Sequence, residues 1–175
     1  SDRAWQAYEQ SDLPKFYLDL GPYRKTAAKD SNPFTPAVNL YFGLEAALEM
    51  MQQEGLDKIF ARHARHRSAA QAGMKAIGLS LFAADGHGSP SITAVAPDGI
   101  DAEQLRKTVK DKFDILLAGG QDHLKGKVFR IGHLGYVCDR DVLTAVSAIE
   151  ATLQSLGLHR GTMGAGVAAA AAALG

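Results

Sequence analysis

The sequence predicts an α+β domain in which a small antiparallel sheet carries helices packed on one face. Apolar residues recur at helical spacing through much of the first half, whereas short stretches after residue 78 alternate with a period of two. The expected strands come in pairs joined by short, turn-rich segments, which favours antiparallel pairing. The expected order is two helices, two strands, a helix, two strands and a helix. This order is typical of helices gathered on one side of an antiparallel layer.

The first half of the chain is expected to hold two long helices after an irregular beginning. A short opening helix is followed by residues 20–36, where glycines and prolines predict an irregular connector. A long helix is expected to start near Pro36, which suits a first turn, with Thr35 as its N-cap. It should end at Gly55, a plausible C-cap, and a second helical run should continue to Gly78.

The second half is expected to alternate strands and helices. Asp101 should cap a helix that runs to about Lys112, and a final helix should run from about Arg140 to Leu156. The expected strands cover residues 79–82, 92–96, 115–117 and 128–131.

A tail rich in glycine and alanine follows, from residue 158 to the end. Its run of alanines is a strong helix former with little to bury, and it is shorter than the roughly 20 apolar residues that span a bilayer. We interpret it as a floppy terminus, or as a vector-derived or degenerate extension, in preference to a functional element.

Composition excludes several classes of function. Nineteen basic and nineteen acidic residues cancel, so neither nucleic acid nor an anionic membrane surface is an implied partner. Cys138 is the single cysteine, which excludes an internal disulfide and agrees with a reducing compartment. Without a secretory or membrane-spanning apolar segment, a soluble cytoplasmic protein is expected. The chain begins at Ser1 without an initiator methionine, and we interpret this start as a cut or as a piece of a longer protein.

The most informative segment is Gly119–Gly135, where an arginine stands in an apolar strand with glycines on both sides. Side chains alternate along a strand, so Phe129 and Ile131 should face the core while Arg130 and Gly132 face the other way. A guanidinium beside a residue without a side chain leaves room for a small anion, and its planar fork matches a carboxylate. The pattern alone also suits an edge-strand arginine in a solvated salt bridge, and it favours that alternative.

This segment resembles the corresponding part of the class V aminotransferases, in the alanine–glyoxylate and serine–pyruvate branch. The resemblance covers about residues 1–156. The segments that carry it are GG-x6-KVFRIGHLG at 119–135, FYLD at 16–19, NPFT at 32–35 and FDI at 113–115.

The resemblance implies the C-terminal domain of a fold-type I enzyme that uses pyridoxal phosphate (PLP), preceded by the long helix that joins the two domains. It assigns residues 1–34 to a connector and a remnant of the large domain. Residues 35–157 then form the small domain with its interdomain helix, and residues 158–175 form the tail.

The resemblance also implies roles for particular residues. Arg130 matches the arginine that binds the α-carboxylate of the substrate. Thr35 matches a threonine that reaches into the partner subunit and helps bind the cofactor phosphate, although a helix cap explains it equally well. Asn32, a second candidate for cofactor binding, stands where many relatives have a tyrosine. Gly119 and Gly120 are expected to supply unusual backbone torsions rather than to contact a ligand.

The implied parent protein is a homodimer that transfers amino groups between small amino acids and 2-oxoacids. In this family a lysine holds PLP, which serves as an electron sink. None of the lysines here follows a strand end in the context that the family uses, and the family's lysine lies just upstream of the position of Ser1. The chain alone is therefore expected to bind no PLP, to contain no catalytic residue and to be inactive.

The sequence also resembles cyanobacterial proteins named as the small subunit of a soluble hydrogenase, and this resemblance implies an alternative function. These relatives are aminotransferase-like in sequence, and they suggest a non-catalytic subunit or carboxylate-binding module of such a complex. Nickel–iron and iron–sulfur centres need several thiolate ligands, so a chain with one cysteine cannot hold such a cluster.

Other features favour a structural interpretation. His63 and His66 lie in a basic helical run without a third metal ligand, so a solvated basic face is preferred to a metal site. Cys138, near His133, is interpreted as a buried or idle thiol rather than a nucleophile. The turn at residues 85–88 lacks the lysine and serine of a P-loop.

Overall fold

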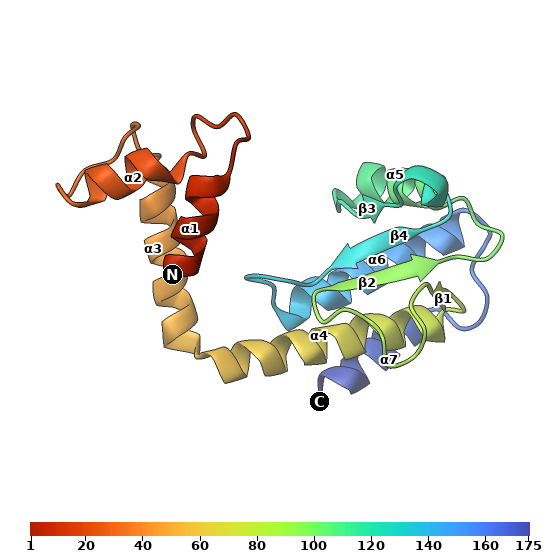
Figure 1. Ribbon diagram of the computed structural model, residues 1–175. Helices are drawn as coiled ribbons and strands as arrows, with labels where there is room; N and C mark the ends of the chain where they lie inside the picture. The colour runs from red at the N-terminus through yellow and green to blue at the C-terminus, as the bar shows by residue number, and fades with distance from the viewer. The chain divides into compact units, whose positions relative to one another are not determined.

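The computed structural model describes residues 1–175 (Figure 1). The chain divides into two compact units, Ser1–Met50 and Met51–Gly175. None of its helices combines the length and the apolar character that crossing a membrane requires.

The first unit is helical, and it holds α1 (Asp2–Gln10), α2 (Leu20–Ala27) and most of α3 (Val38–Glu54). α1 confirms the expected opening helix. α2 lies where the sequence predicted only an irregular connector, so that prediction is wrong for these residues. The Asp19 carboxylate caps α2 by accepting from the Gly21 amide at 3.0 Å. Pro22 falls in the first turn, where its missing amide costs no helical hydrogen bond.

α3 confirms the long helix expected before Gly55 but not the predicted cap at its start. The Ala37 carbonyl accepts from the Tyr41 amide at 3.3 Å, so Ala37 occupies the capping position. Thr35 lies outside the helix, and its prediction as the N-cap is wrong. Gly55 follows the last residue of α3 with a φ of +86°, the left-handed conformation that a C-cap glycine adopts readily.

The second unit contains a four-stranded sheet in the order β1-β2-β4-β3. All neighbouring strands pair antiparallel, which confirms the predicted α+β layer and the order of its elements. The strands are β1 (Ser80–Leu81), β2 (Ile92–Ala96), β3 (Ala118–Gly119) and β4 (Phe129–Gly132).

β3 begins at Ala118, beyond the strand that the sequence predicted at residues 115–117. The preceding helix, α5 (Ala102–Phe113), ends at Asp114 in the left-handed conformation with a φ of 54°. The Leu117 carbonyl then accepts from Arg106 Nε at 2.7 Å and takes no part in the sheet. At the other end of α5, the Asp101 carboxylate accepts from the amides of the first turn, which confirms the predicted cap.

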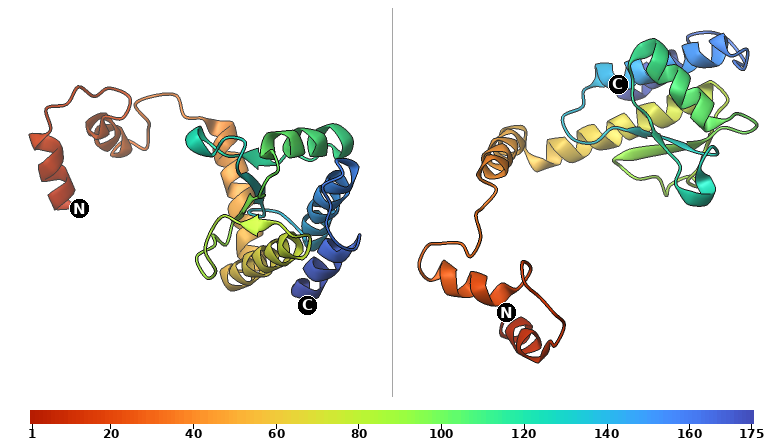
Figure 2. Two further views of the ribbon diagram at one scale, coloured as in Figure 1. Left: turned by 90° about the vertical axis from the view of Figure 1, so that its right-hand side faces the viewer. Right: turned by 90° about the horizontal axis from the view of Figure 1, so that it is seen from above.

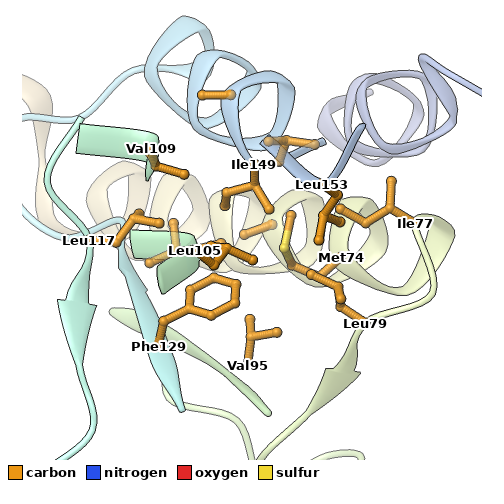
Figure 3. Close-up of a cluster of buried hydrophobic side chains, with 14 of the residues drawn as sticks. Met74, Ile77, Leu79, Val95, Leu105, Val109, Leu117, Phe129, Ile149 and Leu153 are labelled. Carbon is orange, nitrogen blue, oxygen red and sulfur yellow. The ribbon is translucent and has the colours of Figure 1, made fainter. Parts of the chain in front are cut away.

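Helices cover one face of this sheet and enclose the core with it (Figures 1 and 3). α4 (Leu56–Ala76) and α5 contact the strands, and α6 (Asp139–Ser155) packs against both helices. Figure 3 shows Phe129 and Val95 of the strands in one cluster with Met74 of α4 and Ile149 of α6, all fully buried. The prediction of helices on a single face is therefore confirmed.

The tail rich in glycine and alanine forms α7 (Ala165–Leu174), which packs along α4 and α6 (Figure 2). Ala170 is fully buried, so the interpretation of these residues as a floppy terminus is wrong. A side-chain carbon on Gly166 would lie 2.7 Å from Ile77 Cγ2 and 3.2 Å from Val146 Cγ1. The small residues therefore have a packing role, because they let three helices approach closely.

Candidate functional site

Arg130 lies within β4 on the face of the sheet away from the core. Its neighbours along the strand, Phe129 and Ile131, are 0% and 3% exposed, which confirms the predicted alternation. Directly opposite Arg130 stand Ala94 of β2 and Ala118 of β3. Opposite residues in a sheet share a face, so the arginine side chain is flanked by two methyl groups.

The guanidinium of Arg130 is held by backbone rather than by an acidic side chain. Arg130 Nε donates to the Gly119 carbonyl at 3.0 Å, and none of the ion pairs of the chain includes this arginine. A guanidinium has five N–H donors, so the terminal nitrogens keep theirs for a ligand. A side-chain carbon on Gly132 would meet only Leu134 Cδ2, at 3.8 Å, which leaves the space beside Arg130 open. The salt-bridge alternative is therefore not the arrangement found.

Gly119 and Gly120 do not have the unusual torsions that the sequence suggested, because neither has a positive φ. Gly120 is needed for close approach to backbone instead, whereas Gly119 faces the movable ends of side chains from α5. A side-chain carbon on Gly119 would lie 2.6 Å from Arg106 Nη1, and one on Gly120 would lie 2.6 Å from the Leu124 carbonyl carbon. The absence of a side chain at Gly120 lets the following turn pack closely against the end of β3.

Asn32 and Thr35, the two residues predicted to contact the cofactor, lie in the irregular segment before α3, and both are exposed. They belong to a different compact unit from Arg130. Their roles stay predictions.

The lysines of this chain all lie at the surface. Every lysine is exposed, and Lys75, which forms an ion pair, bonds to Asp85 at 2.8 Å on the surface. A lysine that reacts with a carbonyl group is normally activated by an apolar pocket or by a second cation. None of the lysines of the chain has a buried setting of that kind.

Two histidines, His66 and His133, are fully buried, which the sequence analysis did not predict. His66 Nε2 lies 2.8 Å from Asp139 Oδ1, and His133 Nε2 lies 2.9 Å from Thr93 Oγ1. The interpretation of the basic run as a solvated face is therefore wrong at His66. The burial of His133 could have been predicted, because His133 lies two positions after Ile131 and therefore on the same, core-facing side of the chain.

The buried position of His133 predicts a pH-dependent stability. Burial lowers the pKa of His133 from 6.5 to about 4, and the neighbouring His66 acts in the same direction. The unfolded chain therefore takes up this proton at a higher pH than the fold does, so stability should fall as pH drops from about 6.5 to about 4. His133→Gln keeps a hydrogen-bonding partner for Thr93 and should flatten this fall in urea unfolding between about pH 7 and about pH 5. An unchanged slope in the variant would contradict the assignment.

No group of three or more His, Cys, Asp or Glu side chains is arranged to hold a metal ion. Cys138 is exposed, so the buried alternative is wrong, and its interpretation as an idle thiol stays a prediction. It lies just before α6, where its amide donates to Asp141 Oδ2 at 2.9 Å and lowers the pKa of that carboxyl group.

Comparisons with known proteins all indicate the same family. A family model described as aminotransferase class-V matches residues 23–138. The serine–glyoxylate aminotransferase of Arabidopsis thaliana is 35% identical over 173 residues, covering 97% of this chain and 43% of that protein. A crystal structure of ureidoglycine–glyoxylate aminotransferase from Bacillus subtilis matches with a TM-score of 0.88 and 31% identity, covering 99% of this chain and 46% of that one.

A relative of higher identity carries a different name. The small subunit of a soluble hydrogenase from Synechococcus sp. is 63% identical over 174 residues, covering 99% of this chain and 45% of that protein. This match extends through the tail, so the interpretation of the tail as a vector-derived or degenerate extension is wrong. The chain spans less than half the length of each of these relatives.

Proposed function

The chain belongs to the class-V aminotransferase family, and on that premise we propose that it forms the C-terminal part of a PLP-dependent aminotransferase for small amino acids and 2-oxoacids. The observation that supports this substrate class is the setting of Arg130. The Nε–H of Arg130 is bound to the Gly119 carbonyl. The remaining N–H donors of the guanidinium face an open surface lined by the methyl groups of Ala94 and Ala118. A carboxylate accepts two parallel N–H bonds from such a fork.

In this proposal, Arg130 binds the α-carboxylate shared by amino acids and 2-oxoacids, and it thereby orients the carbon next to it. PLP, bound by the whole protein, supplies an electron sink for that carbon. Two of the relatives are named for glyoxylate, a small 2-oxoacid with one carboxylate, which agrees with a site built around a single arginine.

The division of the chain suggested by the family forms part of the proposal. Residues 1–34 would belong to the connector and large domain, residues 35–157 to the small domain and residues 158–175 to its tail. In a cytoplasmic homodimer, Asn32 and Thr35 would contact the cofactor phosphate. Leu40 and Leu44 of α3 are 74% and 54% exposed, which supports a helix that the rest of the whole protein covers.

A second candidate is a non-catalytic, carboxylate-binding subunit of a hydrogenase-containing complex. The name of the Synechococcus relative favours it. The single cysteine means that this chain would contribute no thiolate-held cluster, so such a subunit would act through binding alone.

The test is cofactor binding by the whole protein that ends in this sequence. It should bind PLP, show the absorbance of a cofactor joined to lysine and transfer the amino group of alanine or serine to glyoxylate. Residues 1–175 alone should show no such absorbance when mixed with PLP, because no lysine of the chain has a suitable setting. A whole protein that never shows the absorbance would favour the second candidate.

A further inference from the structure

The basic helical run in α4 does not face solvent throughout, because it binds the loop that follows β4. We infer that Arg62, His63, Arg65 and His66 act as a clamp (the α4 clamp) that positions residues 133–138 beside Arg130, with Arg62 as its central positioning residue. The inference rests on the proposed function only where it names a carboxylate as the ligand of Arg130.

All three guanidinium nitrogens of Arg62 donate within the chain. Its Nε and Nη2 donate to the two carboxylate oxygens of Glu54 at 2.6 and 2.9 Å. Its Nη1 donates to the carbonyls of Gly135 at 2.9 Å and Val137 at 3.0 Å. Glu54 thus fixes the fork in the orientation that the loop carbonyls require. This hydrogen bonding raises the pKa of Arg62 and lowers that of Glu54, so both groups stay charged.

His63 binds the other polar backbone group of the same glycine. The Gly135 amide donates to His63 Nε2 at 3.1 Å, so Nε2 carries no proton. The Nδ1 proton then donates to the Ile59 carbonyl at 2.7 Å, which fixes the ring. Gly135 has a φ of +79°, a conformation that L side chains rarely adopt. Both its amide and its carbonyl are therefore bonded to adjacent residues of α4.

Two further residues of α4 bind Asp139, the first residue of α6, directly after the loop. Arg65 Nη2 and His66 Nε2 both donate to Asp139 Oδ1, each at 2.8 Å. These bonds lower the pKa of Asp139 and keep it ionised. Residues three and four apart on a helix share a face, so Arg62, Arg65 and His66 present their donors to the loop from one side of α4.

The clamped loop borders the open face of Arg130. Leu134 Cδ2 lies 3.8 Å from the place of a side-chain carbon on Gly132, a residue on the same side of β4 as Arg130. Leu134 and Tyr136 are 55% and 88% exposed, so the clamp holds the backbone and leaves these side chains free to meet a ligand. Without the clamp, Leu134 could move across the space that a carboxylate needs.

The test compares Arg62→Ala with Arg67→Ala in the whole protein, using pyruvate as the probe. Arg67 has the same charge on the same helix, but it reaches the Gly88 carbonyl at 3.4 Å and not the loop. Arg62→Ala should weaken pyruvate binding about tenfold in calorimetry and speed amide exchange across residues 133–138, since four hydrogen bonds of Arg62 are lost. Arg67→Ala should change neither quantity.

Arg62→Lys provides a second variant in case the alanine variant does not fold. Lysine keeps a charge that can reach one carbonyl, but it lacks the fork that binds Glu54 and the loop together, so an intermediate loss of pyruvate affinity is expected. Wild-type affinity in Arg62→Lys and in any folded Arg62→Ala, or an equal loss in Arg67→Ala, would overturn the inference. A protein without aminotransferase activity whose pyruvate affinity still falls in Arg62→Ala would contradict the proposed function and support the clamp.

Discussion

Replacing Arg130 with leucine in the whole protein should lower kcat/KM for amino-acid substrates by tens to about a hundredfold. The variant removes the guanidinium fork and leaves the substrate carboxylate without its charged partner, a loss of about 2–3 kcal/mol in transition-state binding. The fold should survive, because Arg130 makes a single hydrogen bond within the chain, to the Gly119 carbonyl, and faces away from the core. Its free energy of unfolding should fall by less than about 1.5 kcal/mol.

Two further variants make this result specific. Arg130→Lys keeps the charge but not the bidentate geometry, and it should recover only part of the lost activity. Arg140→Leu removes an exposed arginine at the start of α6 and should leave kcat/KM unchanged. Steady-state kinetics with alanine as donor and glyoxylate as acceptor measure all three, and urea unfolding measures stability. Equal kcat/KM in Arg130→Leu and wild type would contradict the substrate role, whereas a whole protein without turnover would favour the carboxylate-binding subunit.

The strand that carries Arg130 could be predicted because the sequence pattern that indicates it is local. Alternation along a strand depends only on neighbouring residues, and Phe129 and Ile131 are buried as that rule requires. The order of elements was equally accessible, because short, turn-rich connections leave few alternatives to antiparallel pairing. The open space beside Arg130 could also be predicted from the sequence, because Gly132 has no side chain to fill it.

What the sequence did not predict depends on residues that lie far apart along the chain. His66 and Asp139 are separated by 73 positions, and no periodicity in the basic run distinguishes a solvated face from one covered by such a distant loop. Gly119 shows a similar limit. In a sequence, a glycine suggests an unusual backbone torsion and does not indicate which residue lies close to it. The close approach of Arg106 becomes visible only once β3 and α5 are placed together.

The tail illustrates the same limit for packing. A run of alanines has little apolar surface, so the sequence indicated a segment with nothing to bury. Its small side chains instead allow close contact, with Gly166 against Ile77 and Val146. Steric fit of this kind depends on the surfaces of α4 and α6, which the local sequence of the tail does not encode.

Glu150→Ala should lower the free energy of unfolding by about 2–4 kcal/mol, the largest stability effect expected here. Glu150 is 2% exposed, and its Oε1 accepts from the amides of Gly164 at 2.9 Å and Gly166 at 3.4 Å. His159 Nε2 lies 3.3 Å from the same oxygen. All these partners belong to the tail, so the carboxylate joins the start of α7 to α6. Alanine would leave the buried Gly166 amide and the buried ring of His159 without an acceptor.

Glu103→Ala is the matched control, because Glu103 also lies on a helix and forms an ion pair, with Arg106 at 2.7 Å. That pair is 38% and 26% exposed, so its loss should cost at most about 1 kcal/mol. Urea unfolding measures both variants, and limited proteolysis between residues 157 and 164 should cleave Glu150→Ala faster, because its α7 is less firmly attached. If Glu150→Ala costs no more than Glu103→Ala, the buried carboxylate does not attach α7, and the close packing at Gly166 must do so alone.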